Sequence, residues 1–423
     1  MDETLVRGLL ETALGDEPPI GPLARNSLLA GIRLRRRTRI RRATGGVAAV
    51  VVVAAVIPAA TGAFGNTSSG PRPEAPFSVP KVPSVPTGTA YVINSGGGTV
   101  TPIDLATNTA GKPVDVSGEP VAMAVAPDGK IACVASGATN SGPEPTSAQT
   151  VTPIDLATNT AGKPITLTDP ADAIAVAPDG KIAYVINGFP SRTMTRIDLA
   201  TNTTEKPINL GAEPEQIAMA PHGNTAYLAV AASTKPGSKV TVRGPVRYYF
   251  VPFDLTTNKL GKPVQLGSEQ PAAIAIASDG KTAYVVGQPS STVIAVTPID
   301  LTTLKSEQPI KISTKPGPMQ GYYGQPLAIA IAPDGMTAYV TDGALSTVTP
   351  IDLASDTPGK PISLSGKVGA DAIAISSNGA AAYVANQPSS TVTPIDLATN
   401  KPEKPIKIGS GWDSGFEAIV TVP

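Results

Sequence analysis

The chain has 423 residues, enough for two or three ordinary domains or for one large closed architecture with additional segments. Its 33 basic and 33 acidic residues balance, 41% of the residues are hydrophobic, and glycine and proline supply 41 and 44 residues. The hydrophobic share excludes a wholly disordered chain. The single cysteine excludes an internal disulfide framework and a zinc site built on CxxC pairs.

Basic charge is concentrated at the N-terminus, directly before an apolar run. Residues 1–43 carry nine arginines and five acids, with seven of those arginines in 33–42, and twenty apolar residues follow at 45–64. That length crosses about 30 Å of hydrocarbon as a helix. The sequence therefore predicts a cytoplasmic leader at 1–43 and a single-pass transmembrane helix at 44–64, with the rest extracytoplasmic. A cleaved signal peptide is the alternative, although its basic region is usually much shorter.

Two further features concern the segments on either side of this helix. No aromatic residue interrupts the arginine run, which argues against a nucleic-acid partner. The leader is interpreted as a segment that contacts anionic lipid, or alternatively as a docking peptide. Six prolines in residues 65–89 predict a semi-extended spacer that holds residues 90–423 away from the membrane.

One unit recurs from residue 90 onward and consists of four phrases. They are an Ala/Ile alternation ending in a turn such as PDG, then AYV, then TVTPIDL, and last KPI. Each phrase has period-two patterning and turn residues at its ends, so the unit predicts four short antiparallel strands, A to D. Seven copies of the third phrase, 43 to 56 residues apart, predict an all-β fold, a seven-bladed β-propeller with four-stranded blades.

The ends of the repeat region predict how the ring closes. The first unit begins at its second strand, 90–94, and lacks strand A, whereas the chain finishes with a solitary strand A at 417–423. The two fragments complete one blade, which leaves no free sheet edge at the junction. We expect a monomeric propeller over 90–423.

The second strand and its exit carry a family resemblance. YVIN at 91–94 and 184–187, YVTD at 339–342 and YVAN at 383–386 each precede a segment close to TVTPIDLATN. In these motifs the chain resembles the YVTN-repeat seven-bladed propellers of bacterial envelope and surface proteins. The resemblance covers 90–423 and implies the fold. It implies little about activity, and kinship with propeller lactonases is analogy alone.

The most faithfully repeated carboxylate is predicted to be structural. The stretch TPIDLATNTAGKP occurs at 101–113 and again at 152–164, and every copy of the third phrase ends in aspartate. An aspartate at the end of strand C accepts hydrogen bonds from the backbone of the following turn. The seven aspartates are Asp104, Asp155, Asp198, Asp254, Asp300, Asp352 and Asp396.

The only histidine and the only cysteine are also predicted to be structural. His222 occupies the turn position where other copies have aspartate or asparagine, and Cys133 occupies the tyrosine position of strand B. Because the only histidine is in an A-to-B turn, the chain has no imidazole placed to serve a Ser/His/Asp arrangement. The chain also lacks HExxH, GxSxG and P-loop motifs, so we predict no catalytic residues.

The sequence departs from the repeat on one rim. All long insertions fall in B-to-C or D-to-A connections, which share a rim in a propeller and form what we term the variable rim. The A-to-B and C-to-D turns form the constant rim. Aromatic residues gather in or beside the insertions and predict contacts with a partner, unless they cap blade ends. They are Tyr248, Tyr249, Tyr322, Tyr323, Trp412 and Phe416.

Four acids at the start of strand A are expected at the mouth of the central channel. Asp172, Glu215, Asp371 and Glu417 suit a hard cation such as Ca²⁺ or Mg²⁺, or a cationic ligand, although strand starts are often simply charged and solvated. The sequence thus predicts a non-catalytic, membrane-anchored binding module for a cell-envelope or extracellular protein or glycan. The alternative is a lactonase-like hydrolase or lyase with a divalent metal at this mouth.

Overall fold

A computed structural model describes the repeat region, and its described residues are 88–137, 149–187, 191–232, 246–267, 270–290, 293–313, 328–364, 369–386, 389–408 and 418–422. The chain divides into two compact units, Met1–Gly45 and Gly46–Pro423, and only the second contains described residues. The predicted leader and transmembrane helix, with most of the spacer, therefore lie outside them. Within the described ranges no helix is long and apolar enough to cross a membrane.

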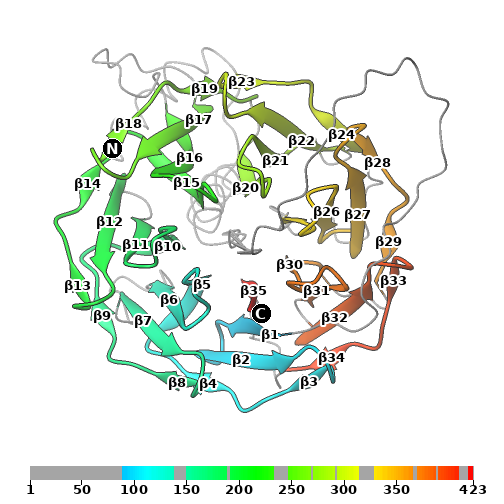
Figure 1. The fold of residues 1–423 in the computed structure, drawn as a ribbon, viewed down its shortest axis with the longest axis horizontal. Helices are drawn as coiled ribbons and strands as arrows, with labels where there is room; N and C mark the ends of the chain where they lie inside the picture. The colour runs from blue at the N-terminus through cyan, green and yellow to red at the C-terminus, as the bar shows by residue number, and fades with distance from the viewer. Residues whose placement is uncertain are drawn as a thin grey trace, which may run out of the picture. The chain divides into compact units, whose positions relative to one another are not determined.

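The described strands form seven antiparallel sheets, which confirms the all-β propeller. Figure 1 shows the sheets around a ring, with the inner strands toward the centre and the shortest strands at the periphery. Blade 1 contains β1 to β4 and β35, and blades 2 to 7 follow in chain order with five strands each. The innermost strands, at position A, are β35 (Ile419–Val422), β5 (Glu119–Val125), β10 (Ala171–Val176), β15 (Glu213–Met219), β20 (Pro271–Ile276), β25 (Ile329–Ile331) and β30 (Ala372–Ile375).

Positions B and C are the two central strands of each blade. The B strands are β1 (Thr89–Asn94), β6 (Ile131–Gly137), β11 (Ile182–Asn187), β16 (Thr225–Ala232), β21 (Thr282–Ser290), β26 (Thr337–Asp342) and β31 (Ala381–Asn386). The C strands are β2 (Thr99–Asp104), β7 (Thr150–Asp155), β12 (Thr193–Asp198), β17 (Arg247–Asp254), β22 (Val293–Asp300), β27 (Thr347–Asp352) and β32 (Thr391–Asp396).

The outermost position, D, consists of two short segments instead of the single strand expected from the sequence. The first segments are β3 (Thr109–Ala110), β8 (Thr160–Ala161), β13 (Thr203–Thr204), β18 (Lys259–Leu260), β23 (Lys305–Ser306), β28 (Thr357–Pro358) and β33 (Lys401–Pro402). The second segments are β4 (Val114–Asp115), β9 (Ile165–Thr166), β14 (Ile208–Asn209), β19 (Val264–Gln265), β24 (Ile310–Ser313), β29 (Ile362–Ser363) and β34 (Ile406–Lys407).

Proline explains the interruption of the outer strand. In blade 1, Pro113 separates the two segments and has no N–H to donate. Pro102 of strand C accepts a 2.8 Å hydrogen bond from the Gly111 N–H, so its own nitrogen faces the same outer side, where no ladder bond is required. Lysine stands before that outer proline in six blades and is exposed each time. Lysine and proline on an edge strand block pairing with another chain. These lysines are Lys112, Lys163, Lys206, Lys262, Lys360 and Lys404.

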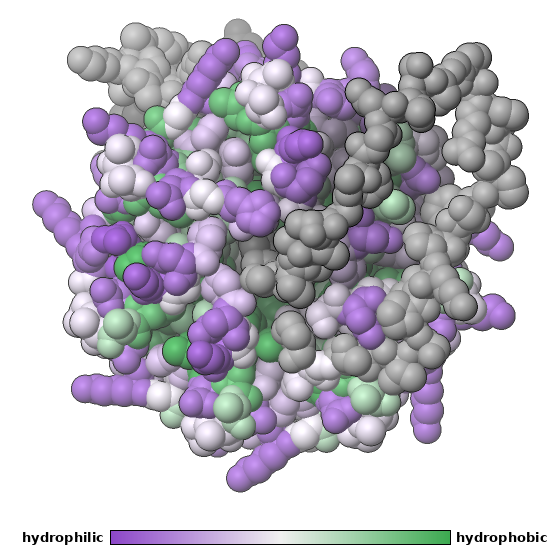
Figure 2. Space-filling model, in the orientation of Figure 1, coloured by the Kyte–Doolittle hydropathy of each residue, from purple (hydrophilic) through white to green (hydrophobic). Residues whose placement is uncertain are grey.

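The core lies between neighbouring blades, where small side chains face large ones. Ala122 and Ala124 of blade 2 pack in one cluster with Ile174 and Val176 of blade 3. The Ala/Ile alternation of strand A therefore lets adjacent sheets approach closely. Hydrophilic side chains project around the periphery of the face that Figure 2 shows.

The ring closes as the sequence predicts. β35 pairs antiparallel with β1, with Thr89 opposite Val422. The Thr421 hydroxyl donates to the Ile375 carbonyl across the boundary between blades 1 and 7, at 2.6 Å. The C-terminal strand is thereby joined to the first and last blades.

The tyrosine of strand B joins each of several blades to the next. The Tyr91 hydroxyl of blade 1 donates to Asn159 Oδ1 of blade 2 at 2.8 Å. The Tyr383 hydroxyl of blade 7 donates to the Leu105 carbonyl at 3.2 Å and to Asn108 Oδ1 at 3.0 Å, both in blade 1. The asparagine in this turn has positive φ, 54° at Asn108, a conformation that asparagine tolerates better than most residues. The repeated Tyr and Asn thus link neighbouring blades through hydrogen bonds.

Candidate functional site

The repeated aspartates cap the C-to-D turns on the constant rim, as predicted. Asp104 Oδ1 accepts hydrogen bonds from the Thr107 backbone N–H and hydroxyl, both at 2.9 Å. These hydrogen bonds hold the pKa of Asp104 below its usual range. The N–H three residues on makes the same bond in the other six blades, at 2.8 or 2.9 Å, to Asp155, Asp198, Asp254, Asp300, Asp352 and Asp396.

Neither rare side chain lies at a reactive position. His222 is exposed in its A-to-B turn, whereas Cys133 is fully buried between blades 2 and 3. Burial raises the pKa of the Cys133 thiol to about 12, so the thiolate does not form near neutral pH. The structural roles predicted for both residues agree with this placement.

The predicted aromatic surface is described only in blade 4. Tyr249 is buried, 5% exposed, in the core between blades 3 and 4. Tyr248 is half-buried and packs against the core between blades 4 and 5. Of this pair, only Tyr248 presents area to solvent. The other predicted aromatics, Tyr322, Tyr323, Trp412 and Phe416, lie outside the described residues.

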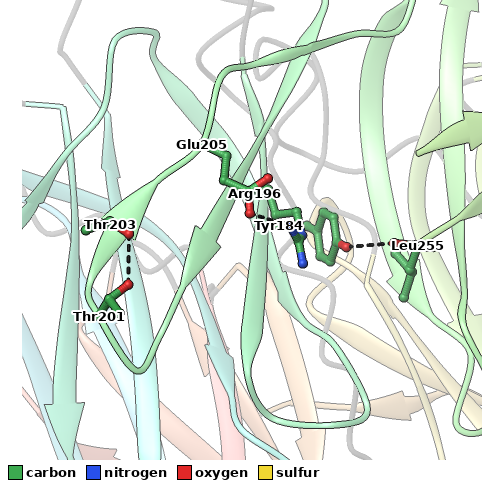
Figure 3. Close-up of polar contacts among 6 residues, drawn as sticks. All are labelled: Tyr184, Arg196, Thr201, Thr203, Glu205 and Leu255. Carbon is green, nitrogen blue, oxygen red and sulfur yellow. Dashed lines mark hydrogen bonds and ion pairs between the residues drawn. The ribbon is translucent and has the colours of Figure 1, made fainter. Parts of the chain in front are cut away.

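Blade 3 carries a charged group at its outer edge that the repeat lacks elsewhere. Arg196 replaces the proline of strand C, lies opposite Tyr184 in the register and forms an ion pair with Glu205 of the outer strand (Figure 3). The Tyr184 hydroxyl donates to the Leu255 carbonyl of blade 4 at 3.5 Å. Because Arg196 already has a carboxylate partner, we regard the pair as part of the blade edge.

β-bulges position the acids at the start of strand A. In blades 3 and 4 the pairing register with strand B shifts at Asp172 and at Glu215, and the same shift occurs at Val121 in blade 2. A bulge adds an unpaired residue and turns its side chain away from the regular alternation. Glu215 consequently reaches the next blade, where Gln270 Nε2 donates to its Oε2 at 2.7 Å.

The structure describes three of the four predicted acids, and they belong to three different blades. Asp172 and Glu215 interact across the boundary between blades 3 and 4. Asp371 is in blade 7, is 6% exposed, and its N–H donates to the Ala385 carbonyl at 2.9 Å. Glu417 lies outside the described residues. Among the described acids of this set, the interaction between Asp172 and Glu215 is the one that joins neighbouring blades.

A third carboxylate belongs to this group. Glu213 begins β15, is partly exposed, and acts electrostatically on both Asp172 and Glu215. Glu213 was not predicted as a site residue. Glu119 holds the equivalent position in blade 2, so its position alone did not distinguish Glu213 from an ordinary first residue of a strand. The EPE spacing of Glu213 and Glu215 is the signal that identifies two adjacent carboxylates.

Burial and like charge set the protonation of this group. Burial, followed by the charges of Glu215 and Glu213, raises the pKa of Asp172 to about 7. Burial and the Glu213 charge also raise the pKa of Glu215 to about 7, against the opposing hydrogen bond from Gln270. Both carboxyls therefore change charge near neutral pH, which is frequent at functional sites.

Gln216 is a buried polar residue beside these carboxylates. It is 2% exposed, and its side-chain oxygen has no hydrogen-bond partner among the residues that the structure describes. The equivalent residues in blades 2 and 3 are Ala122 and Ala173. Leaving an amide oxygen buried and unpaired costs about 1–3 kcal/mol, a cost that an alanine at this position would avoid.

No metal site is assembled in the described ranges. They contain no group of three or more histidine, cysteine, aspartate or glutamate side chains arranged to hold a metal ion. A Ca²⁺ or Mg²⁺ site at the mouth stays a prediction, because Glu417 is not among the described residues.

Fold and site together define the class of protein, a seven-bladed β-propeller. No protein-family model and no curated protein matches the chain. Among solved structures, hydrazine synthase of Kuenenia stuttgartiensis is 19% identical with a TM-score of 0.59, over 77% of this chain and 99% of that one.

Two other solved structures are similar. A functionally unknown protein from Desulfotomaculum acetoxidans is 16% identical with a TM-score of 0.59, over 79% of this chain and 99% of its own. The Cps50 (Swd1) β-propeller domain of Myceliophteria thermophila is 9% identical with a TM-score of 0.56, over 74% of this chain and 97% of its own. At these identities the likeness concerns the fold alone.

Proposed function

We propose that the chain is a membrane-anchored, extracytoplasmic propeller of the YVTN-repeat kind that binds a protein or glycan of the cell envelope or its surroundings without catalysing a reaction. The orientation of the ring relative to its N-terminal entry carries the proposal. The Leu105 N–H donates to the Gly88 carbonyl at 3.2 Å, so the segment before β1 reaches the ring beside a C-to-D turn of the constant rim. Asp172 and Glu215 begin strand A at the opposite rim.

This orientation supports a structural role for the constant rim and a binding role for the variable rim. The constant rim consists of aspartate-capped turns with one geometry in all seven blades. Asp172 and Glu215 lie at the other rim, where the sequence also predicts the insertions, and the proposed tether before Gly88 would direct this rim away from the proposed anchor. Loops on a rigid scaffold are where binding residues usually lie.

Replacing insertions 234–245 and 315–326 with short Gly/Ser linkers tests the proposal. We expect the variant to keep the thermal unfolding midpoint of the unmodified protein, because the described strands of each blade pair with one another, and to lose capture of its partner from envelope extracts. Unchanged capture of the same partner would contradict binding through this rim.

A metal-dependent hydrolase or lyase, lactonase-like in chemistry, is the competing proposal. It is favoured by the raised pKa values of the neighbouring Asp172 and Glu215, which suit proton transfer near neutral pH. Thermal unfolding with Ca²⁺, Mg²⁺ or Mn²⁺ separates the two proposals. A binding module is expected to show no stabilisation, and stabilisation that Glu215→Gln removes would favour the hydrolase.

A further inference from the structure

We propose that Asp172, Glu213, Glu215 and Gln216 form an anchoring site for a basic side chain, lysine or arginine, of a protein partner. The inference rests on the proposed binding function and names the chemistry that its central site recognises. Two observations carry it. No described cation neutralises this set of hydrogen-bond acceptors, and one buried acceptor has no partner within the described ranges.

The acceptors come from two adjacent inner strands. Asp172 on β10 interacts electrostatically with Glu215 and Glu213 on β15, across the boundary between blades 3 and 4. Bulges at Asp172 and Glu215 turn these side chains out of the regular alternation. Three carboxylates thus act on one another at the rim that points away from the N-terminal entry.

The charge of this group is not balanced within the described part of the chain. Its described ion pairs join Lys130 to Asp128 and Arg196 to Glu205, and neither pair includes one of the three carboxylates. The one described side-chain donor to the group is the neutral amide of Gln270. Partly buried carboxylates without a cation are costly, and an added cation relieves both burial and mutual repulsion.

Gln216 is an independent observation that points to a ligand. Its side chain lies on the same face of β15 as Ala218, which packs in the core against Ile274 of blade 5. Glu215 extends toward blade 5 as well, to Gln270. The unpaired Gln216 oxygen is thus an acceptor in the boundary that Glu215 spans, where blades 2 and 3 have alanine.

The arrangement fits an organic cation better than a metal ion. The described acids form no group of three that could surround a metal. Glu213 and Glu215 are nonetheless close enough to raise the pKa of Asp172, and acceptors spread over two strands suit a ligand with several spread donors. A guanidinium presents five N–H donors and an ammonium three, and both hydrogen-bond to carboxylate and amide oxygens.

Titration of the full chain with acetyl-arginine amide and acetyl-lysine amide, followed by NMR or calorimetry, tests the proposal. Acetyl-citrulline amide is the matched neutral control, because it keeps the shape of arginine and loses the charge. We expect saturable binding of the two cations at millimolar concentration and none of citrulline. Equal binding of citrulline, or saturable binding of Ca²⁺ alone, would overturn the site.

Three variants identify the residues. Asp172→Asn and Glu215→Gln are each expected to weaken the cation at least tenfold, and Gln216→Ala about threefold. The last change introduces the residue that blades 2 and 3 carry, so it should fold. Glu119→Gln, at the position equivalent to Glu213 in blade 2, is the control and should leave affinity unchanged. An equal loss in Glu119→Gln would show a general charge effect instead of a site.

Failure of this site is distinguishable from failure of the proposed function. If Asp172→Asn/Glu215→Gln still captures the envelope partner while the insertion-deleted variant does not, the binding module stands and the anchoring site is wrong. If neither variant loses capture, the proposed function fails as well.

Discussion

The carboxylates of the propeller fall into two groups with opposite responses to pH. Backbone hydrogen bonds lower the pKa of Asp104, Asp155, Asp198, Asp254 and Asp300, whereas burial and like charge raise the pKa of Asp172 and Glu215. The first group stabilises the fold when ionised. The second stabilises the fold only while protonated, so side chains of one chemical kind have different roles on the two rims.

Asp172→Asn should therefore flatten the pH dependence of stability. The folded protein favours the neutral form of the Asp172 carboxyl. The stability that this group contributes is therefore complete below the ordinary aspartate pKa and is lost as the pH rises through about 7. We expect the variant to be about 4 kcal/mol more stable than the unmodified protein at pH 8 and equally stable at pH 4. Urea unfolding at the two pH values measures both quantities.

Asp104→Asn is the contrasting control for that experiment. The pKa of Asp104 is lowered by hydrogen bonds from the Thr107 backbone and side chain, so its contribution is present at neutral pH and lost in acid. We expect this variant to be less stable than the unmodified protein at pH 7, with the deficit disappearing as the pH falls through the lowered pKa. The same sign for both variants would contradict the two assigned environments.

The tyrosines of strand B give a second residue-level prediction. Tyr383→Phe removes two hydrogen bonds across the closing boundary and leaves buried acceptors, so we expect a loss of about 1–2 kcal/mol in urea unfolding. Tyr227→Phe is the matched control. Tyr227 stacks on Phe250, and Leu304 stands in the next turn where blade 1 has Asn108. We expect Tyr227→Phe to lower the free energy of unfolding by less than about 0.5 kcal/mol. Equal losses in the two variants would contradict the role of the Tyr383 hydroxyl as a link between blades.

At the scale of the strand, whether strand C tolerates a proline depends on which side of the strand the backbone nitrogen at that residue faces. Arg196 occupies the position of Pro102, and its carbonyl accepts the Glu205 N–H at 2.8 Å on the outer side. Its nitrogen therefore faces the interruption of the outer strand. Thr195, one residue earlier, faces strand B, where it pairs with Val185.

Arg196→Pro should consequently be tolerated and Thr195→Pro should not. The first change removes a partly exposed ion pair and inserts the residue that six blades carry, so we expect a change below about 1 kcal/mol. The second removes a ladder hydrogen bond between central strands and should cost about 3 kcal/mol or more. Thermal unfolding of both variants measures the difference, and a severe loss in Arg196→Pro would contradict the assigned geometry.

The same scale shows what the sequence could and could not predict. Strand order, the aspartate-capped turns and the closure by residues 419–422 followed from repeats, because seven copies constrain the register of each other. The bulge at Asp172 did not, because its register shift comes from pairing with β11 and has no local marker. Tyr249 was predicted at the surface because it adjoins an insertion, but cross-strand pairing with Val230 places it in the core.

At the scale of the molecule, ring closure and orientation connect the fold to the proposed function. β1 pairs with both β2 and β35, so the first described strand of the chain is held in the interior of a sheet. The proposed tether would therefore join, at Gly88, a strand that is paired on both sides. The carboxylates of blades 3 and 4 lie at the other rim, which is the arrangement expected of a binding module that faces away from its anchor.

Labelling of intact cells with a membrane-impermeant maleimide tests the proposed topology most directly. The native Cys133 is fully buried and provides a silent background, so single reporters at Ser27→Cys, in the leader, and at the exposed Lys112→Cys can be compared. An anchored extracytoplasmic propeller predicts labelling of Lys112→Cys in intact cells and of Ser27→Cys only after lysis. Protection of Lys112→Cys until lysis would contradict it.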